Sequence, residues 1–171
     1  MKILGILLIC TSCSLCGFVI DRWKKQRLNE LQKWIDAFER LKGEIEYRMT
    51  PLYESSILIA NFAPDNIKKV FLDFAKMLKE KESTDLYQMW QRAIHKNEGL
   101  FHLNEEDYKL IGEFARKYDG ADKSMHQKSL SHIIERLRYE LDKEQKEYQK
   151  TSKLNRYLGV LIGICISIFL I

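Results

Sequence analysis

The sequence predicts an all-α protein, a cytoplasmic six-helix bundle with a transmembrane helix at each end. Charged residues are absent from residues 3–20 and 157–171, and every Asp and Glu lies in the segment between them. In that middle segment, apolar residues recur every three or four positions, which is the period of a helix buried along one side. No alternating strand pattern or repeat competes with this periodicity, and 171 residues have room for one compact domain.

The first apolar run, residues 3–20, has 18 residues, close to the roughly 20 that a helix needs to cross the hydrocarbon core of a bilayer. A cleaved signal peptide is the simplest alternative, but no small-residue cleavage site follows the run. Instead, four cations come directly after it: Arg22, Lys24, Lys25 and Arg27. We therefore expect an uncleaved N-terminal anchor over residues 1–20.

The second apolar run, residues 157–171, has 15 residues and reaches 18 if its helix begins at Leu154 and the Arg156 side chain extends to the interface. Cations also precede this run: Lys143, Lys146, Lys150, Lys153 and Arg156. Because segments flanked by Lys and Arg stay in the cytoplasm, we expect a two-pass protein of the cell membrane with residues 21–156 cytoplasmic and both termini outside.

The overall charge is mildly basic, with 28 Lys and Arg against 24 Asp and Glu and a net charge of +4. The excess is concentrated beside the apolar runs, where anionic membrane lipids would attract it. No basic stripe lies elsewhere in the chain, so we predict no binding to nucleic acid.

The first two helices of the bundle are separated by Thr50-Pro51. No Pro or Gly interrupts the chain from the first apolar run to Gly43, a mild break, so the anchor is expected to continue into the first bundle helix. Thr50 is expected to cap the second helix with its hydroxyl and Pro51 to occupy the first helical position. That helix should end near Ala60, before Pro64.

Three further helices follow, each bounded by turn or cap residues. The third begins at Asp65 or Asn66, the turn at residues 83–85 supplies caps for a fourth that ends at Gly99, and Asn104 caps a fifth that Asp119-Gly120 closes. The expected buried positions are Leu31, Ile35, Phe38, Leu41, Ile45, Ile67, Val70, Phe71, Phe74, Met77, Leu78, Leu86, Trp90, Ala93, Ile94, Tyr108, Ile111, Gly112, Ala115 and Tyr118.

The last helix is long and changes character along its length. Its first part carries an apolar stripe that ends at Leu141, whereas Tyr148 is the only apolar residue from 142 to 153. We therefore predict four parts in the chain: an anchor over residues 1–20, a bundle over 21–141, a polar helical stalk over 142–156 and a second transmembrane helix over 157–171.

The cysteines are the most conspicuous candidates for chemistry. Cys10, Cys13 and Cys16 would lie along one side of a helix, where three thiolates could hold a soft metal, or Cys13 could carry a lipid. The simpler interpretation is that cysteine is a small apolar residue suited to a membrane helix interface. A role for these cysteines beyond packing stays open.

The histidines and turn acids offer weaker candidates. The four histidines are His95, His102, His126 and His132. None pairs with another at the spacing of a helical metal site, and His132 with Glu135 supplies only one of the two pairs that a di-metal bundle site requires. An acidic pair among Glu113, Asp119 and Asp122 is explained more simply as a solvated turn. Because no phosphate-binding loop, nucleophile elbow or zinc-protease motif is present, we predict no catalytic, cofactor-binding or metal site, no cofactor and no enzymatic activity.

Four groups of residues follow a known pattern. The first reads "L..EI.Y..TPL.E" and consists of Leu41, Glu44, Ile45, Tyr47, Thr50, Pro51, Leu52 and Glu54. The second reads "W..A" and consists of Trp90 and Ala93. The third reads "GL..L..ED......F" and consists of Gly99, Leu100, Leu103, Glu106, Asp107 and Phe114. With the closing "YLG" at residues 157–159, the chain resembles the stage III sporulation protein AB family along essentially its whole length. It departs at Ala115, where the family has Gly, and at residues 118–122, which replace a Leu-Gly-x-Ser-Asp turn.

The resemblance implies a component of the sporulation apparatus that links mother cell and forespore in endospore-forming bacteria, held in the cell membrane on the mother-cell side. It also implies a domain similar to the helical cytoplasmic domain of type II secretion platform protein F. In that arrangement the partners are a secretion-type ATPase (sporulation protein AA), other membrane components of the channel, and membrane lipids.

The leading hypothesis is therefore an assembly or platform protein that acts by contact. A membrane-bound hydrolase or metal enzyme that uses the turn acids or histidines is the first alternative. A tether that organises lipids through its basic clusters is the second.

Overall fold

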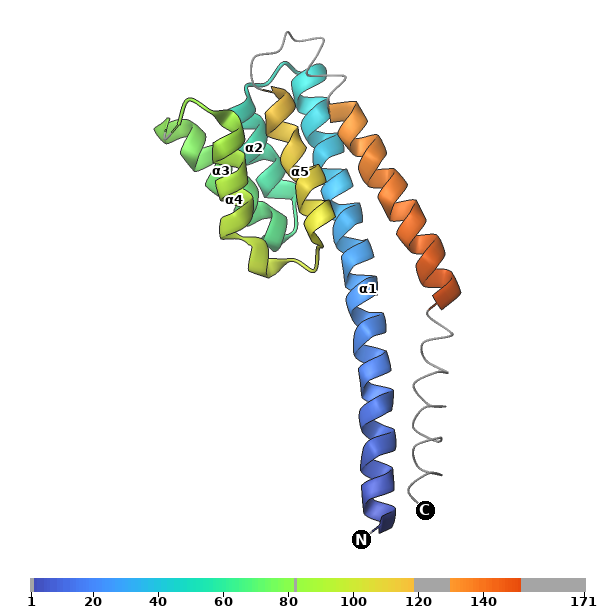
Figure 1. Ribbon diagram of the computed structural model, residues 1–171. Coiled ribbons are helices and arrows are strands. Elements are labelled where there is room, and N and C mark those ends of the chain that lie inside the picture. Colours follow the sequence, from blue (N-terminus) through green and yellow to red (C-terminus); the bar gives the residue numbers. More distant parts are fainter. Residues whose placement is uncertain (1, 82, 119–129, 152–171) are drawn as a thin grey trace. The chain divides into compact units, whose positions relative to one another are not determined.

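The computed structural model describes residues 2–81, 83–118 and 130–151, without the side chains of residues 2–18, 117 and 118. This part of the chain is helical and contains no strand, which confirms the all-α prediction (Figure 1). Its elements are α1 (Lys2–Glu46), α2 (Leu52–Phe62), α3 (Asp65–Glu80), α4 (Leu86–Lys96), the short 3-10 helix η1 (Glu98–Leu100), α5 (Glu105–Tyr118) and a sixth α-helix over residues 130–151.

The chain divides into two compact units. One consists of Met1–Leu28 and Asp142–Ile171 and is called the stem; the other, Asn29–Leu141, is called the bundle. The first part of α1 belongs to the stem and its last part to the bundle. The expectation that the first apolar run continues without a break into the first bundle helix is confirmed, and the helix also runs through Gly43, where we expected a break.

The bundle is built around an aromatic cluster with Trp90 at its centre. The Trp90 ring lies 4.9 Å from that of Phe74, 5.1 Å from Phe114 and 5.4 Å from Phe71, measured between centroids. Its indole N–H, which burial removes from water, donates to the carbonyl oxygen of Ile111 at 2.9 Å. A buried indole therefore gains a large apolar contact area without leaving a donor unsatisfied.

Most of the predicted core positions are buried. The half-buried ones, packed against the core, are Ile45, Met77, Leu78, Leu86, Tyr108 and Leu141. The Tyr118 side chain lies outside the described residues. The prediction missed several buried side chains, including Trp34, Leu103, Leu110 and Phe114.

The predicted cap of α2 is wrong. The carbonyl of Pro51 accepts the first backbone hydrogen bond, from Ser55 at 2.9 Å, so Pro51 itself precedes the helix and Thr50 lies one residue farther out. The Thr50 hydroxyl instead lies 3.4 Å from Glu44 Oε2. The helix then extends to Phe62, two residues past the predicted end.

Helices α4 and α5 begin at side-chain caps. Asp85 accepts hydrogen bonds from the backbone N–H groups of Tyr87 and Gln88, as the turn predicted. Asn104 accepts from Asp107 N–H at 2.8 Å while the Asp107 carboxylate accepts from Asn104 N–H at 3.0 Å, which is a reciprocal capping box.

The predicted end of α4 is wrong. The helix ends at Lys96, because the Asn97 side chain bonds back to the carbonyl of Ala93 at 2.9 Å, and Gly99 lies in η1.

The last helix continues through residues 142–151, and most of its side chains there are exposed. Within the stem, Arg27 on α1 forms an ion pair of 2.9 Å with Glu144 on this helix. Among the described residues, no helix is both long enough and apolar enough to cross a membrane, so the two predicted transmembrane helices are not confirmed. Residues 157–171, the Asp119-Gly120 turn and the side chains of all four cysteines lie outside the described residues.

Candidate interaction surface

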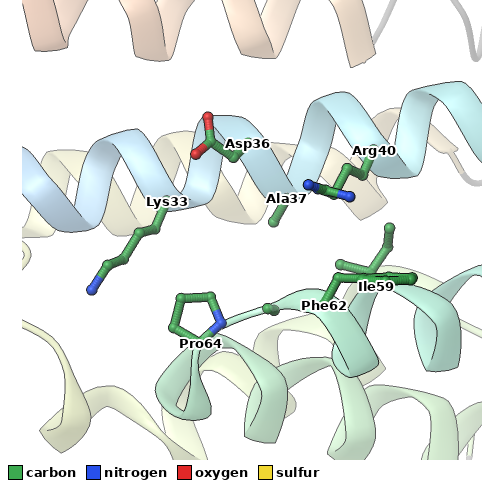
Figure 2. Close-up of a pocket in the computed structure, with 8 residues that line it drawn as sticks. Lys33, Asp36, Ala37, Arg40, Ile59, Phe62 and Pro64 are labelled. Atoms are coloured by element: carbon green, nitrogen blue, oxygen red, sulfur yellow. The ribbon is translucent and has the colours of Figure 1, made fainter.

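Two adjoining hollows lie between α1 and α2 in the bundle, with volumes of about 200 and 330 Å³. They share three lining residues, Arg40, Ile59 and Phe62, so we treat the two neighbouring hollows as one groove. We call it the α1–α2 groove and define it by Lys33, Ala37, Arg40, Tyr47, Ile59 and Phe62. Figure 2 shows the first hollow, with α1 along one side and the end of α2 along the other.

The local sequence explains why the groove is open. Ala37 lies between Lys33 and Arg40 on the same side of α1, and its small side chain leaves space above α2. At the other wall, α2 ends at Phe62 because Ala63 is extended and Pro64 precedes α3. The chain turns away there, which leaves the Phe62 ring 70% exposed.

Aromatic rings line both hollows and face solvent. Tyr47, just past the end of α1, is 86% exposed and lines the second hollow, whereas Phe62 lines both. The guanidinium carbon of Arg40 lies 5.5 Å from the centroid of the Phe62 ring, within the range of a cation–π contact (Figure 2). The groove thus combines exposed aromatic surface with cationic side chains.

A separate hollow, of about 360 Å³, lies on α4 and α5, outside the α1–α2 groove. It is lined by Tyr87, Gln91, Tyr108, Lys109, Glu113 and Arg116. Most of these side chains already have partners within the protein. Arg116 lies 5.8 Å from the Tyr87 ring centroid, and the Tyr108 hydroxyl donates a hydrogen bond to the carbonyl of Glu98. Glu113 accepts a hydrogen bond from Arg136. Burial raises the pKa of Tyr108 to about 12, assisted by nearby carboxylates, so its hydroxyl stays protonated at neutral pH.

The histidines that the sequence singled out lie in separate places. His102 lies against Glu30 on α1: its backbone N–H donates to Glu30 Oε2 at 2.6 Å, and its Nδ1 lies 3.2 Å from Oε1. His95 lies 2.9 Å from Glu98, His132 is exposed on the last helix, and His126 lies outside the described residues.

The contact between Glu30 and His102 was not predicted from the sequence. Glu30 is only 7% exposed, and its position four residues before Trp34 on the buried side of α1 was the signal that it required a partner.

The turn acids do not form a described site. Glu113 binds Arg136 through both carboxylate oxygens, at 3.3 Å each, and Asp119 and Asp122 lie outside the described residues. Within the described ranges, no three His, Cys, Asp or Glu side chains are grouped to hold a metal ion.

A polar network that the prediction missed joins α3 to the end of α4. Asp73 accepts hydrogen bonds from Lys96 at 2.7 Å and Asn97 at 2.8 Å. Burial raises the pKa of Asp73, but the hydrogen bonds and the charge of Lys96 outweigh burial and hold that pKa below its usual 3.8.

Comparison with known proteins agrees with the pattern of residues described above. The family model of stage III sporulation protein AB matches residues 2–171. Stage III sporulation protein AB of Bacillus subtilis (strain 168) is 25% identical over 171 residues, which is 99% of each chain. A solved structure of stage III sporulation protein AB covers 72% of this chain and 97% of its own with a TM-score of 0.66 at 21% identity, so the two share a fold. Since the family model matches almost every residue, the chain belongs to the stage III sporulation protein AB family.

Proposed function

We propose that this chain is a membrane-anchored assembly component of the sporulation channel apparatus between mother cell and forespore, and that its bundle contacts a secretion-type ATPase. The observation that carries the proposal is the match of the family model over residues 2–171, which includes both apolar runs as well as the bundle. The protein would act by contact, as a platform on which other components assemble, and no chemical step is assigned to it.

The membrane part of the proposal depends on the two ends of the chain. Each apolar run is flanked by a cluster of cations on the side of the bundle, which favours a cytoplasmic bundle. Trp23 supports this boundary, because it is exposed beside Arg22 and Lys25, and aromatic and cationic side chains are enriched where a helix leaves a bilayer. The location would be the cell membrane on the mother-cell side of the forespore envelope.

Cysteine labelling tests this topology. All four native cysteines would be replaced by serine or alanine, and single probes placed near Met1 and at the exposed Thr84. A membrane-impermeant maleimide added to intact cells should label the probe near Met1 and not the Thr84→Cys probe. External labelling of Thr84→Cys, in cells whose cytoplasmic control protein stays unlabelled, would overturn the topology.

The ATPase (sporulation protein AA) is the proposed partner. A bundle with an exposed aromatic groove offers a surface for a protein contact. Full-length protein in detergent, mixed with the purified ATPase with and without nucleotide, should associate in the micromolar range of transient assemblies, where about 1 μM corresponds to roughly 8.2 kcal/mol. No association at high concentration, while the protein still joins the assembly in cells, would move the working interface to another component.

A lipid-organising tether is the second candidate, and the exposed side chains of Arg22 and Lys25 favour it. Full-length protein reconstituted in vesicles would then cluster anionic lipids in a salt-sensitive manner and recover no protein partner. Association with the ATPase that persists when Arg22 and Lys25 are replaced by glutamine would favour the platform.

A further inference from the structure

The charges beside the α1–α2 groove are not balanced. Between Asn29 and Glu46, α1 carries five carboxylates, and each has a partner. Three form ion pairs: Glu39 with Arg138, Glu44 with Arg48, and Glu46 with Lys42. Glu30 accepts a hydrogen bond from His102. Asp36, at the edge of the first hollow, accepts one from the neutral amide of Gln32, and its carboxylate points away from the α2 side of the hollow (Figure 2). By contrast, no carboxylate of the described residues lies within ion-pair distance of Lys33 or Arg40, and the Arg40 guanidinium lies over the Phe62 ring.

These two cations lie on either side of the apolar part of the hollow, which is lined by Ala37, Ile59 and Phe62. Lys33 and Arg40 are seven residues apart, which is two turns of helix and roughly 10.5 Å at about 1.5 Å per residue, so they project on the same side of α1. Figure 2 shows both side chains at the hollow, with Ala37 between them and Ile59, Phe62 and Pro64 opposite.

The hollow between the cations is large enough for one apolar side chain. Its volume is about 200 Å³, whereas cavities of about 150 Å³ already accept a benzene ring. The exposed face of the Phe62 ring would cover such a side chain from the α2 side. A ligand that fits is therefore apolar at its centre and negatively charged about 5 Å to either side, which is half the spacing of the two cations.

We propose that the α1–α2 groove binds an amphipathic helix of a partner protein, in which one apolar side chain lies between two carboxylates about two turns apart. The apolar side chain enters the hollow beside Ala37 and Phe62, and the carboxylates pair with Lys33 and Arg40. This inference rests on the proposed function of the bundle as a contact module, and it names the face and the chemistry of the partner.

Designed peptides test the proposal directly. The probe is an 18-residue fluorescent helical peptide with Leu at position 8 and Glu at positions 5 and 12, in an Ala/Gln background. A second peptide replaces both Glu by Lys. Fluorescence anisotropy is measured with full-length protein in detergent. The Glu peptide should bind, and the Lys peptide should bind at least about tenfold more weakly.

Charge reversal on the protein provides the matched variants. Lys33→Glu/Arg40→Glu should weaken binding of the Glu peptide at least about tenfold and strengthen binding of the Lys peptide. The reason is that the reversed charges repel glutamate and attract lysine. The control is Lys69→Glu/Lys76→Glu, which reverses two exposed lysines at the same seven-residue spacing on α3, outside the groove, and should leave both affinities within about twofold. Phe62→Ala should also weaken the Glu peptide without moving the urea midpoint, since the ring is exposed.

The outcomes separate this inference from the proposed function. No binding of the Glu peptide to wild-type protein at about millimolar concentration overturns the groove proposal, as does binding that both double variants reduce equally. If the groove variant binds the ATPase as well as wild type, the platform role stands and the groove is not its interface. Another outcome is that wild type binds the Glu peptide, with the preference reversed in the Lys33→Glu/Arg40→Glu variant, and fails to bind the ATPase. In that case the groove proposal is supported and the named partner is wrong. A second copy of this chain as occupant would appear as a concentration-dependent dimer that Phe62→Ala abolishes, and that too would contradict the proposal.

Discussion

In the bundle, every α-helix buries aromatic or aliphatic side chains in one common core, whereas the stem, in its described side chains, buries only Asp21. The stem helices are linked instead by charge, through Arg27 and Glu144, and the stalk adds an exposed pair between Asp142 and Lys146. Apolar burial is worth far more than an exposed ion pair, so the bundle has a source of stability that the polar stalk lacks. The stability of the stalk helix therefore depends on charged contacts and on solvent conditions more than that of the bundle does.

The largest expected effect is in the bundle core. Trp90→Ala removes a fully buried indole together with its hydrogen bond to Ile111, so it should lower the free energy of unfolding by roughly 3–5 kcal/mol. Urea unfolding followed by circular dichroism measures it. The control is Tyr139→Ala, whose ring is 69% exposed and whose loss should be small. Equal effects of the two substitutions would show that the aromatic cluster does not dominate stability.

A smaller effect is expected at the start of α5. Asn104→Ala removes the side chain that accepts Asp107 N–H and should lower the free energy of unfolding by about 1 kcal/mol. Asn61→Ala, at an exposed position near the end of α2, is the matched control, since it removes the same amide without a cap. A urea midpoint for Asn104→Ala equal to that of the control would show that the capping box contributes nothing.

The stem offers the counterpart to these substitutions. A double-mutant cycle with Arg27→Gln and Glu144→Gln should give a coupling energy of roughly 0.2–1 kcal/mol. The coupling should shrink as salt is raised from low to about 1 M, because screening weakens partly exposed charges. The Trp90→Ala effect should change little over the same range. A salt-independent coupling above about 2 kcal/mol would contradict the contrast between the two units.

The smallest effect is expected at Thr50. The sequence alone predicted a loss of about 1 kcal/mol for Thr50→Val through a missing cap. Because the hydroxyl lies 3.4 Å from Glu44 and caps nothing, the expected loss is below about 0.5 kcal/mol. A drop in stability as large as that of Asn104→Ala would support the cap that the sequence predicted at Thr50.

What the sequence predicted well was local. The helices and the caps at Asp85 and Asn104 depend on residues within a few positions of one another, and those relations are visible in the order of the residues. The cap assigned to Thr50 failed by a single residue, because Pro51 can precede a helix as well as begin one.

The relations that the sequence did not reveal join distant segments. Glu30 meets His102 across 72 positions, and Asp73 meets Asn97 across 24. The groove depends on which face of α1 packs near the end of α2, and on an alanine that leaves space between them. Periodicity identifies a buried stripe but not its neighbours, so neither the groove nor its unpaired cations could be located from the pattern.

The longest of these contacts has a consequence for synthesis of the chain. Glu39 on α1 pairs with Arg138, 99 positions later, and the Trp34 side of α1 shares a core with Leu130 and Leu137. On the ribosome, α1 is made first but cannot complete its packing until the last bundle helix has emerged, because contacts of high sequence separation form only when both ends are available. The nascent bundle should therefore expose apolar surface until late in translation. Ribosome-bound chains arrested with residue 118 outside the exit tunnel should be cut by protease within α1, whereas chains with residue 145 outside should be protected. Protection at the shorter length would show that helices α1 to α5 already form a closed core.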